Sequence, residues 1–221
     1  MVNKRLNVLA IDDHPIVLEG YYFMLKNMKH DYVDIDFKKV SDGKTGVKTI
    51  TGHTGNPFDI ALIDYSIPKY LEENIQSGKD LAVLVRKKMP NCKIIMLTMH
   101  RESTIIANIL QQVNPEGFIN KSDCTTDELT DAFSTVLSNG YYYSKTIKSY
   151  LTRREKGVVL EDVDIRILIL ISKGVKNTEL GNFIPLSDSD IQKHKSKIKT
   201  LLKVEGDDNE LIEIARNQGY L

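Results

Sequence analysis

The segment NVLAIDDHP at residues 7–15 decides the fold, because a short apolar run ends abruptly at two aspartates. Four comparable runs follow, and the segments between them have the periodicity of helices. Strands that alternate with helices form a parallel sheet through right-handed crossovers. The sequence therefore predicts a five-stranded α/β domain over residues 1–140. Its predicted strands are residues 7–11, 35–40, 60–63, 93–98 and 117–120, and its predicted helices lie at about 15–29, 43–51, 78–88, 103–112 and 126–138.

From Glu161 onward the chain shows no strand pattern. Residues 141–159, which precede this part, have the pattern of a short helix followed by a charged linker. Residues 160–221 then predict a small all-helical domain. Its helices are expected at about 161–173, 177–183, 187–202 and 208–217.

Composition excludes several classes of protein. The 221 residues carry 30 basic and 30 acidic side chains, so a nucleic acid or a membrane surface would have to meet a local patch. No apolar run approaches the roughly 20 residues that cross a bilayer, and Asp12 interrupts the first run too early for a secretion signal. The two cysteines, Cys92 and Cys124, predict neither a disulfide framework nor a zinc site. We therefore expect a cytoplasmic protein without a membrane partner.

Carboxylates stand where two predicted strands end. Asp12 and Asp13 follow the first strand, and Asp64 follows the third. In a doubly wound sheet of order 2-1-3-4-5 the carboxyl ends of these strands meet at the topological switch point, so the three side chains are expected to converge. Such a cluster repels itself unless a cation binds, and its oxygen ligands suit Mg²⁺. Thr98 and Lys121 lie at the same edge, where a hydroxyl and an ammonium group can hold a phosphoryl group.

These residues lie in motifs that resemble those of response-regulator receiver domains, which have a flavodoxin-like fold. The matching segments are IDDHP at 11–15, LIDYSIP at 62–68, IIMLT at 94–98 and GFINK at 117–121, in the order and spacing of the family. The resemblance implies that Asp64 accepts a phosphoryl group from the phosphohistidine of a cognate histidine kinase. It also implies that Asp12, Asp13, Asp64 and the backbone carbonyl of Ser66 hold the Mg²⁺ cofactor.

The same resemblance implies how the site changes state. Thr98 and Lys121 bind phosphoryl oxygens, because phosphoryl transfer depends on positioning and on neutralising oxygen charge. Phe118 matches the aromatic switch position of the family, and Thr98 acts with it. Phosphorylation adds nearly two negative charges, pulls Thr98 inward and lets the ring follow, which remodels the surrounding face. We expect a homodimer on phosphorylation.

Two features beside the site depart from the receiver pattern. Gly78 follows Asp64 by 14 residues, further than the corresponding glycine does in the family, so the loop KYLEENIQS at 69–77 contains an insertion. Met99 stands where a small residue is usual, next to His100. We expect the loop to alter kinase docking or dephosphorylation and Met99 to narrow access for small phosphodonors. His100 is either a neighbour of the site or a simply exposed side chain.

Positive charge is concentrated on one predicted helix near the C-terminus. Residues 191–203, IQKHKSKIKTLLK, contain five lysines and no carboxylate. Apolar residues at helical spacing are expected to face the core and to leave the lysines on the outer arc, which suits either a solvated face or contact with DNA. Ser187 and Asp190 form an approximate capping box. The apolar residues are Ile191, Ile198, Leu201 and Leu202, and the lysines are Lys193, Lys195, Lys197, Lys199 and Lys203.

The segment LEDVDIRILILISKGVKNTELGNFIPLSDSDIQKHKSKIKTLLKV at 160–204 resembles the helix-turn-helix domains of the LuxR/NarL type. The match includes an apolar helix that ends at Gly174, a second helix capped by Asn177 and a recognition helix that begins after Ser187. It implies that residues 160–221 bind double-stranded DNA. By this resemblance the recognition helix contacts base edges through Gln192, Lys193 and Ser196 and phosphates through Lys195, Lys197 and Lys199, with His194 either packed or facing a phosphate.

The two resemblances predict a phosphorylation-switched, DNA-binding transcription regulator of a two-component system rather than an enzyme. Asp190 replaces the family's threonine, and EDVDI at 161–165 replaces a Thr-Pro-Arg-Glu-like start. These departures leave an alternative open, in which a degenerate helical domain binds an acidic protein through its lysine helix. A metal-dependent phosphatase built on the three aspartates is a third hypothesis, which gives Lys121 and the helical domain no role.

Overall fold

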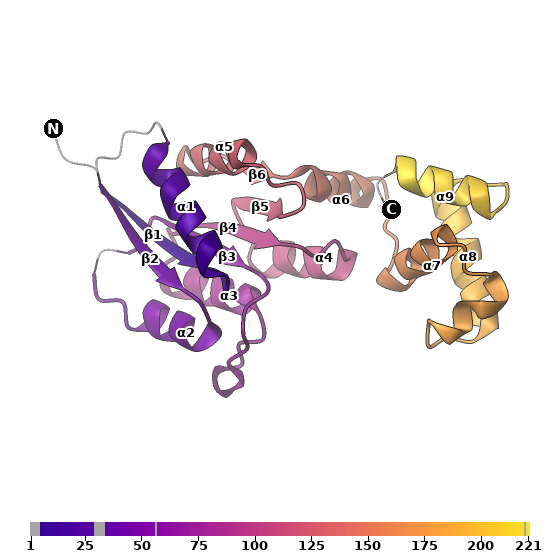
Figure 1. Cartoon of the computed structure of the whole chain (residues 1–221), viewed down its shortest axis with the longest axis horizontal. Coiled ribbons are helices and arrows are strands. Elements are labelled where there is room, and N and C mark those ends of the chain that lie inside the picture. Colours follow the sequence, from indigo (N-terminus) through magenta and orange to yellow (C-terminus); the bar gives the residue numbers. More distant parts are fainter. Residues whose placement is uncertain (1–4, 29–33, 56, 219) are drawn as a thin grey trace. The chain divides into compact units, whose positions relative to one another are not determined.

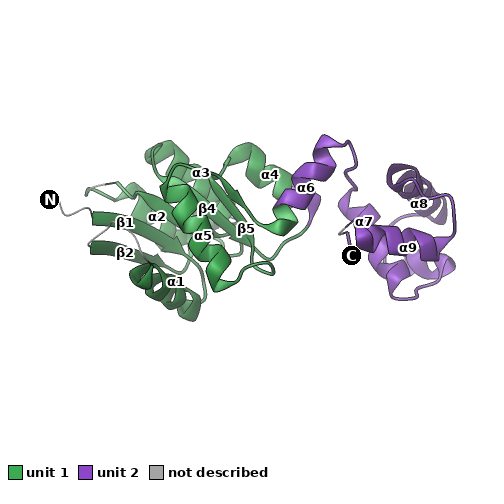
Figure 2. Cartoon of the chain, turned by 90° about the horizontal axis from the view of Figure 1, so that it is seen from above, with its two compact units in different colours: residues 1–101, 106–147 green, residues 102–105, 148–221 purple. Residues whose placement is uncertain are grey.

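The computed structural model describes residues 5–28, 34–55, 57–218 and 220–221, and the chain forms two compact units (Figure 2). The first unit consists of residues 1–101 and 106–147, and the second of residues 102–105 and 148–221. The change from one unit to the other after Ile147 falls inside the segment that the sequence predicts as a linker.

A parallel sheet forms the centre of the first unit (Figure 1). The strand order is β2-β1-β3-β4-β5-β6, and each neighbouring pair is parallel. The first five strands confirm the predicted order 2-1-3-4-5, and the sixth is an addition that the sequence did not predict. The strands are β1 (Arg5–Ile11), β2 (Asp34–Val40), β3 (Ile60–Asp64), β4 (Lys93–Thr98), β5 (Gly117–Asn120) and β6 (Tyr142–Tyr143).

Helices cover both faces of this sheet, with α1 and α5 on one face and α2, α3 and α4 on the other (Figure 1). The bounds of α2, α3 and α4 agree with the prediction. Residue 29, where the first helix is predicted to end, lies outside the described residues. The helices are α1 (Pro15–Asn27), α2 (Gly43–Thr51), α3 (Gly78–Lys88), α4 (Ser103–Gln112) and α5 (Thr126–Leu137).

The middle of the sheet is the core of the unit. Every residue of β3 is buried, which explains why its sequence is apolar without alternation, because helices cover both faces. Leu62 of β3 and Leu97 of β4 pack in one cluster with Phe133 of α5, and all three side chains are almost fully buried. The strand ends that follow this core are therefore held in fixed positions.

A two-residue strand and a helix follow α5. Tyr142 and Tyr143 form β6 beside β5, opposite Gly117 and Phe118. Two residues are too few for the alternation by which a strand is recognised in a sequence, so β6 could not be predicted. Helix α6 (Lys145–Glu155) begins directly after β6, within the predicted linker.

The second unit contains a small helical core, as predicted. Leu168, Ile198 and Leu211 are fully buried in it, each from a different helix. Within the described residues, no helix has both the length and the apolar composition that a membrane crossing requires. The elements are α7 (Asp162–Ser172), η2 (Asn177–Asn182), α8 (Asp188–Leu202) and α9 (Asp208–Asn217).

The second predicted helix of this unit, at 177–183, is a 3₁₀ helix of six residues rather than an α-helix. Asn177 does not cap it, because the cap position is Lys176 and its side chain makes no capping bond. The Asn177 amide instead donates to Asp208 at 2.9 Å, at the start of α9. The predicted helix is therefore present in the tighter 3₁₀ form, and the prediction of its asparagine cap is wrong.

An ion pair holds together the edge of the sheet remote from the carboxylates. Arg86 of α3 donates to Glu116 at 2.6 Å, and the same carboxylate oxygen accepts from the backbone N–H of Ile94 at 2.8 Å. Although burial raises the pKa of Glu116, the bonds from Arg86 and Ile94 outweigh it and hold this pKa below its usual value. Arg86 also donates to the backbone carbonyls of Cys92, Val113 and Asn114.

We expect Glu116→Gln to lower the free energy of unfolding by about 1–3 kcal/mol at neutral pH, because Arg86 loses its charged partner in a half-buried place. Urea unfolding measures this loss. The loss should shrink as the pH falls through the lowered pKa of Glu116, since protonation of the wild type removes the same interaction. Glu19→Gln is the control, because the pair of Glu19 with Lys39 is exposed and worth about 1 kcal/mol at most. Equal losses in the two variants would contradict the structural role of Glu116.

Candidate functional site

Four predicted site residues stand at the carboxyl edge of the sheet. Asp12 follows β1, Asp64 ends β3, Thr98 ends β4 and Lys121 follows β5. The parallel register places these positions side by side, since Asp64 lies opposite Leu97 and Thr98 opposite Asn120. Asp12, Asp64 and Thr98 are buried, so they face the interior of this edge rather than open solvent.

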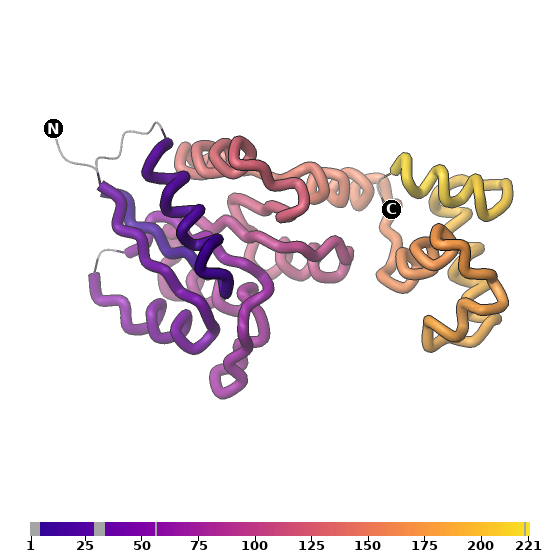
Figure 3. The backbone as a smooth tube through the Cα atoms, in the orientation of Figure 1, coloured from indigo at the N-terminus to yellow at the C-terminus, as the bar shows by residue number. Residues whose placement is uncertain are grey.

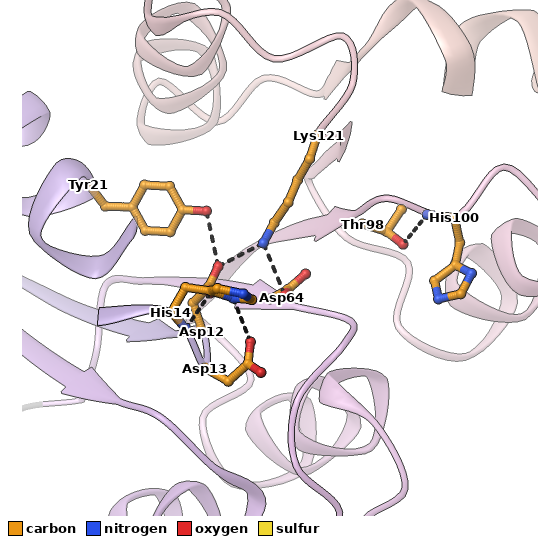
Figure 4. Close-up of polar contacts among 8 residues, drawn as sticks. All are labelled: Asp12, Asp13, His14, Tyr21, Asp64, Thr98, His100 and Lys121. Carbon is orange, nitrogen blue, oxygen red and sulfur yellow. Dashed lines mark hydrogen bonds and ion pairs between the residues drawn. The ribbon is translucent and has the colours of Figure 1, made fainter. Parts of the chain in front are cut away.

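The ammonium group of Lys121 connects the two buried carboxylates (Figure 4). Its Nζ lies 2.8 Å from Oδ2 of Asp12 and 3.0 Å from Oδ2 of Asp64. Asp13 lies beside them and is more exposed, and its Oδ1 is 2.8 Å from Nδ1 of His14. The three predicted aspartates and Lys121 thus form one polar cluster, which does not include the hydroxyl of Thr98.

Burial and charge act against each other in this cluster. Burial raises the pKa of the Asp64 carboxyl above its usual value, and the attraction of Lys121 offsets this only in part. Burial alone would lower the pKa of Lys121, but its bonds to Asp12 and Asp64 outweigh that effect and raise it. A group of buried carboxylates with too little positive charge favours a bound cation.

Oxygen ligands for such a cation are present. Carboxylate oxygens of Asp12 and Asp13 and a ring nitrogen of His14 lie within 4.8 Å of one another. Carboxylates are the ligands that Mg²⁺ prefers, and the cation binds through one or two of them with water. The predicted acidic pair Asp12 and Asp13 therefore fits Mg²⁺, whereas Asp64, the third predicted carboxylate ligand, lies outside this group.

Tyr21 of α1 is a site residue that the sequence reasoning missed. Its hydroxyl donates to Oδ2 of Asp12 at 3.4 Å, and burial together with the negative charge of Asp12 raises its pKa, so it stays protonated and can donate. A signal was present, because Leu18, Tyr21 and Leu25 have the spacing of one buried helix face. This spacing predicts that the Tyr21 side chain is buried. It does not predict that the Tyr21 hydroxyl contacts Asp12.

The two predicted switch residues are buried in this structure. The hydroxyl oxygen of Thr98 accepts a hydrogen bond from the backbone N–H of His100 at 3.0 Å (Figure 4). Phe118 is fully buried. The His100 ring lies edge-on to the ring of Tyr65, with centroids 5.0 Å apart, so His100 is a neighbour of the site rather than a simply exposed side chain.

The loop at 69–77 forms a small hairpin between β3 and α3 (Figure 3). Tyr70 and Ile75 pair in an antiparallel bridge through backbone bonds of 2.8 and 3.0 Å, and Ile75 is buried. A cleft of about 810 Å³ lies between this hairpin and Asp13, and Ser66 also lines it. The insertion therefore shapes the approach to the site.

Gly78, the first residue of α3, packs closely against the backbone of Asp64, the candidate phosphoacceptor. A Cβ atom at Gly78 would lie 1.8 Å from the backbone oxygen of Asp64, which no side chain can tolerate. The backbone N–H of Gly78 also donates to the carbonyl of Tyr65 at 2.9 Å. Only glycine fits this place, so the end of the insertion is fixed to the strand that carries Asp64.

The lysine helix α8 differs from the prediction at Lys195. This side chain is buried, and its Nζ donates to Asn177 at 2.7 Å and to Asp208 at 2.8 Å. The prediction that Lys195 lies on the outer arc, where it would contact a phosphate, is therefore wrong. The partners are 18 and 13 residues away in the chain, so helical spacing alone could not reveal them.

Two further side chains of α8 bind within the helical unit. Nδ1 of His194 lies 2.6 Å from Oδ1 of Asp164, a fully buried carboxylate. Nζ of Lys197 lies 3.2 Å from the other oxygen of Asp164 and also pairs with Glu161. Of the two alternatives for His194, the structure favours the packed ring. Asp164 and Glu161 lie in the segment that departs from the resembled LuxR/NarL pattern, and they anchor α8.

The exposed face of α8 is less basic than the sequence suggests. Gln192, Lys193 and Ser196 are exposed there. Lys193 pairs with Asp190 at 2.9 Å, and Asp190 also accepts a bond from Ser187, the cap residue. Lys199 donates to the carbonyl of Gly206 at 2.7 Å and remains partly exposed.

A model of the response regulator receiver domain matches residues 8–134, more than half of the chain. The chain belongs to the response regulators. This response regulator is 28% identical over 205 residues to the transcriptional regulatory protein MctR of Rhizobium johnstonii, covering 90% of this chain and 88% of MctR. It is 25% identical to the response regulator UvrY of Escherichia coli K12, covering 97% of this chain and 95% of UvrY.

Solved structures of RcsB have the same fold as this response regulator. RcsB of Salmonella typhimurium aligns with a TM-score of 0.59 at 21% identity, covering 98% of this chain and 100% of RcsB. A structure of an RcsB–DNA complex aligns with a TM-score of 0.60 at 22% identity, covering 96% of this chain and 98% of RcsB. At this identity the likeness concerns the fold.

We expect Lys195→Met to lower the stability of the helical unit of this response regulator by about 1.5–3 kcal/mol, because Asn177 and Asp208 lose a charged donor in a buried place. Lys193→Met removes the same charge from an exposed side chain and should change stability by about 0.5 kcal/mol at most. Chemical unfolding followed by circular dichroism compares the two. A Lys195→Met variant as stable as Lys193→Met would show that the buried network contributes nothing.

Proposed function

We propose that this response regulator accepts a phosphoryl group on Asp64 from the phosphohistidine of a histidine kinase, and that this modification controls DNA binding by the helical unit. The observation that carries the proposal is the ammonium group of Lys121 held between Asp12 and Asp64 at the end of the sheet. This arrangement supplies a nucleophile, an acidic pair for a cation and a positive group for the transferred phosphoryl oxygens.

In the proposed transfer, a carboxylate oxygen of Asp64 attacks the phosphorus atom. An oxygen–phosphorus bond forms, the phosphorus–nitrogen bond breaks, and the kinase histidine leaves with the electron pair. Asp12, Asp13, Asp64 and the Ser66 carbonyl would hold Mg²⁺, which supplies positive charge for the phosphoryl oxygens. Lys121 turns from Asp12 toward a phosphoryl oxygen, while His14 and Tyr21 continue to donate to Asp12.

The proposed readout starts at Thr98. Its hydroxyl turns toward a phosphoryl oxygen and gives up the bond from the N–H of His100. Phe118 is fully buried on the adjacent strand, so its packing changes with Thr98. Nearly two added charges drive this change.

The proposed DNA surface is the exposed face of α8, with Gln192, Lys193 and Ser196 at base edges. Lys197 and Lys199 can reach phosphates only by sharing or leaving their present partners. The resemblance to LuxR/NarL-type domains and the relatives that are named transcriptional regulators support DNA as the partner. We further propose a homodimer, because one helix-turn-helix reads only a half-site.

Incubation with phosphoramidate and Mg²⁺ is expected to phosphorylate the chain on Asp64 alone, as measured by intact mass and borohydride trapping. Asp64→Asn should abolish the label because the nucleophile is gone, and a chelator should abolish it in the wild type because Mg²⁺ is removed.

Asp59→Asn is the matched control, because it makes the same change at the other end of β3 and should leave the label intact. Substantial label on Asp64→Asn would refute the assignment. Steady release of phosphate from a phosphomonoester would instead favour the metal-dependent phosphatase.

Lys193→Ala is expected to weaken binding to a duplex selected by the phosphorylated wild type from a random library. If Lys193 contacts a base, the gap between this duplex and random DNA should narrow by about 1–3 kcal/mol. Affinities at several salt concentrations separate this effect from a lost phosphate contact, which would lower the salt slope by about one for every sequence.

Lys26→Ala removes the same charge from α1 of the receiver and is the control. Unchanged binding of Lys193→Ala and of Gln192→Ala to every duplex would exclude α8 as the reading helix. The alternative in which the helical unit binds an acidic protein would then be favoured.

A further inference from the structure

Asp123 lies two residues after Lys121 and binds the start of helix α6. Its Oδ2 accepts from the backbone N–H of Thr146 at 2.7 Å and from the hydroxyl of Ser144 at 2.8 Å. Its Oδ1 accepts from the hydroxyl of Thr146 at 3.0 Å. All three donors belong to the first turn of α6 or to the residue that precedes it.

Asp123 therefore caps α6 from a distant part of the chain. The first N–H groups of a helix lack partners within the helix, and a carboxylate at this end also meets the positive end of the helix dipole. Burial raises the pKa of Asp123, but the bonds from Thr146 and Ser144 outweigh it and lower this pKa, so the carboxylate is charged at neutral pH. A cap is usually supplied by the residue just before the helix, whereas this one is 23 residues away.

The same loop is bound to the phosphorylation site on its other side. The backbone N–H of Lys121 donates to the carbonyl of Thr98 at 2.7 Å. The side-chain amide of Asn120, which is fully buried, donates to the carbonyl of His100 at 2.8 Å, and the backbone N–H of Asn120 donates to the hydroxyl of Ser144 at 3.0 Å. Hydrogen bonds and the backbone of residues 120–123 thus connect Thr98 and Lys121 to the start of α6.

Helix α6 also carries the chain from one compact unit to the other. The first unit ends after Ile147, in the first turn of α6, and the rest of the helix belongs to the second unit. A change at the start of α6 is therefore a change at the connection between the receiver and the helical unit.

We propose that Asp123 is the positioning residue through which the Lys121 loop controls α6, so that phosphorylation of Asp64 alters the start of this helix. The inference rests on the proposed function. When Lys121 turns from Asp12 to a phosphoryl oxygen, residues 120–123 shift with it. The charged cap follows because leaving the N–H of Thr146 without a partner is costly, and charge-assisted bonds are the stronger kind.

Hydrogen exchange of the full-length chain tests this proposal, with BeF₃⁻ and Mg²⁺ as a stable mimic of the phosphoryl group. ¹⁹F NMR shows separately whether BeF₃⁻ binds. In the wild type, exchange in the first turn of α6 should change when BeF₃⁻ binds. In Asp123→Asn, BeF₃⁻ should still bind. Hydrogen exchange in the first turn of α6 should be about tenfold faster even without BeF₃⁻, as expected for a lost cap. The change in exchange on BeF₃⁻ binding should disappear.

Asp127→Asn is the matched control, because Asp127 is exposed in the first turn of α5 and should leave the response unchanged. Ser144→Ala tests the same connection from the helix side and should also uncouple α6, even if Asp123→Asn fails to fold. A response that persists in Asp123→Asn or, where that variant is unfolded, in Ser144→Ala would overturn the proposal, because the cap would then be only structural.

A wild type that binds BeF₃⁻ without any change in α6 would overturn the proposal as well. A wild type that fails to bind BeF₃⁻ would refute the proposed phosphorylation itself, and this inference would fall with it. The two failures are distinguished by the ¹⁹F signal.

Discussion

The ammonium group of Lys121 is shared by two buried carboxylates, and the arrangement of the receiver depends on this contact. Asp12 follows β1 and Asp64 ends the neighbouring strand β3. Without a positive group between them, their repulsion would oppose folding at this edge. A lysine can be shared in this way because its charge is compact and its stem flexible. The same property lets it turn to a new anion, so the contact that stabilises the resting site is also the one that a phosphoryl group would compete for.

Much of the receiver could be predicted from the sequence, because its strands are short apolar runs and its acidic residues stop two of them. Features that depend on distant partners could not. Strand β6 has two residues and is defined by its pairing with β5, which is distant in the sequence. The hydroxyl of Tyr21 reaches Asp12 across the core, and only the burial of the tyrosine is visible as periodicity. Asp123 has no local signature at all, since the helix that it caps begins 22 residues later.

The positions of the lysine charges on α8 could not be predicted from helical spacing alone. Spacing places a residue on one side of a helix, but a long side chain can bend back toward a carboxylate on another element. Lys195 does so toward Asp208, and Lys197 toward Asp164. Glu161 and Asp164 lie in the segment that departs from the LuxR/NarL pattern, and they hold Lys197 and His194. The segment that departs from the pattern thus has a structural role, because it connects α7 to α8.

The close approach of Gly78 to the backbone of Asp64 separates what can vary in this receiver from what cannot. The hairpin before Gly78 is tied at its base, and α3 restarts from a point that admits no side chain. Chain length can therefore be added or removed in the hairpin without displacing the carboxylate of Asp64. The inserted hairpin can therefore be exchanged for one of another length. Grafting hairpins of other lengths onto this position offers a way to alter the approach to Asp64 while the geometry of the carboxylates stays the same.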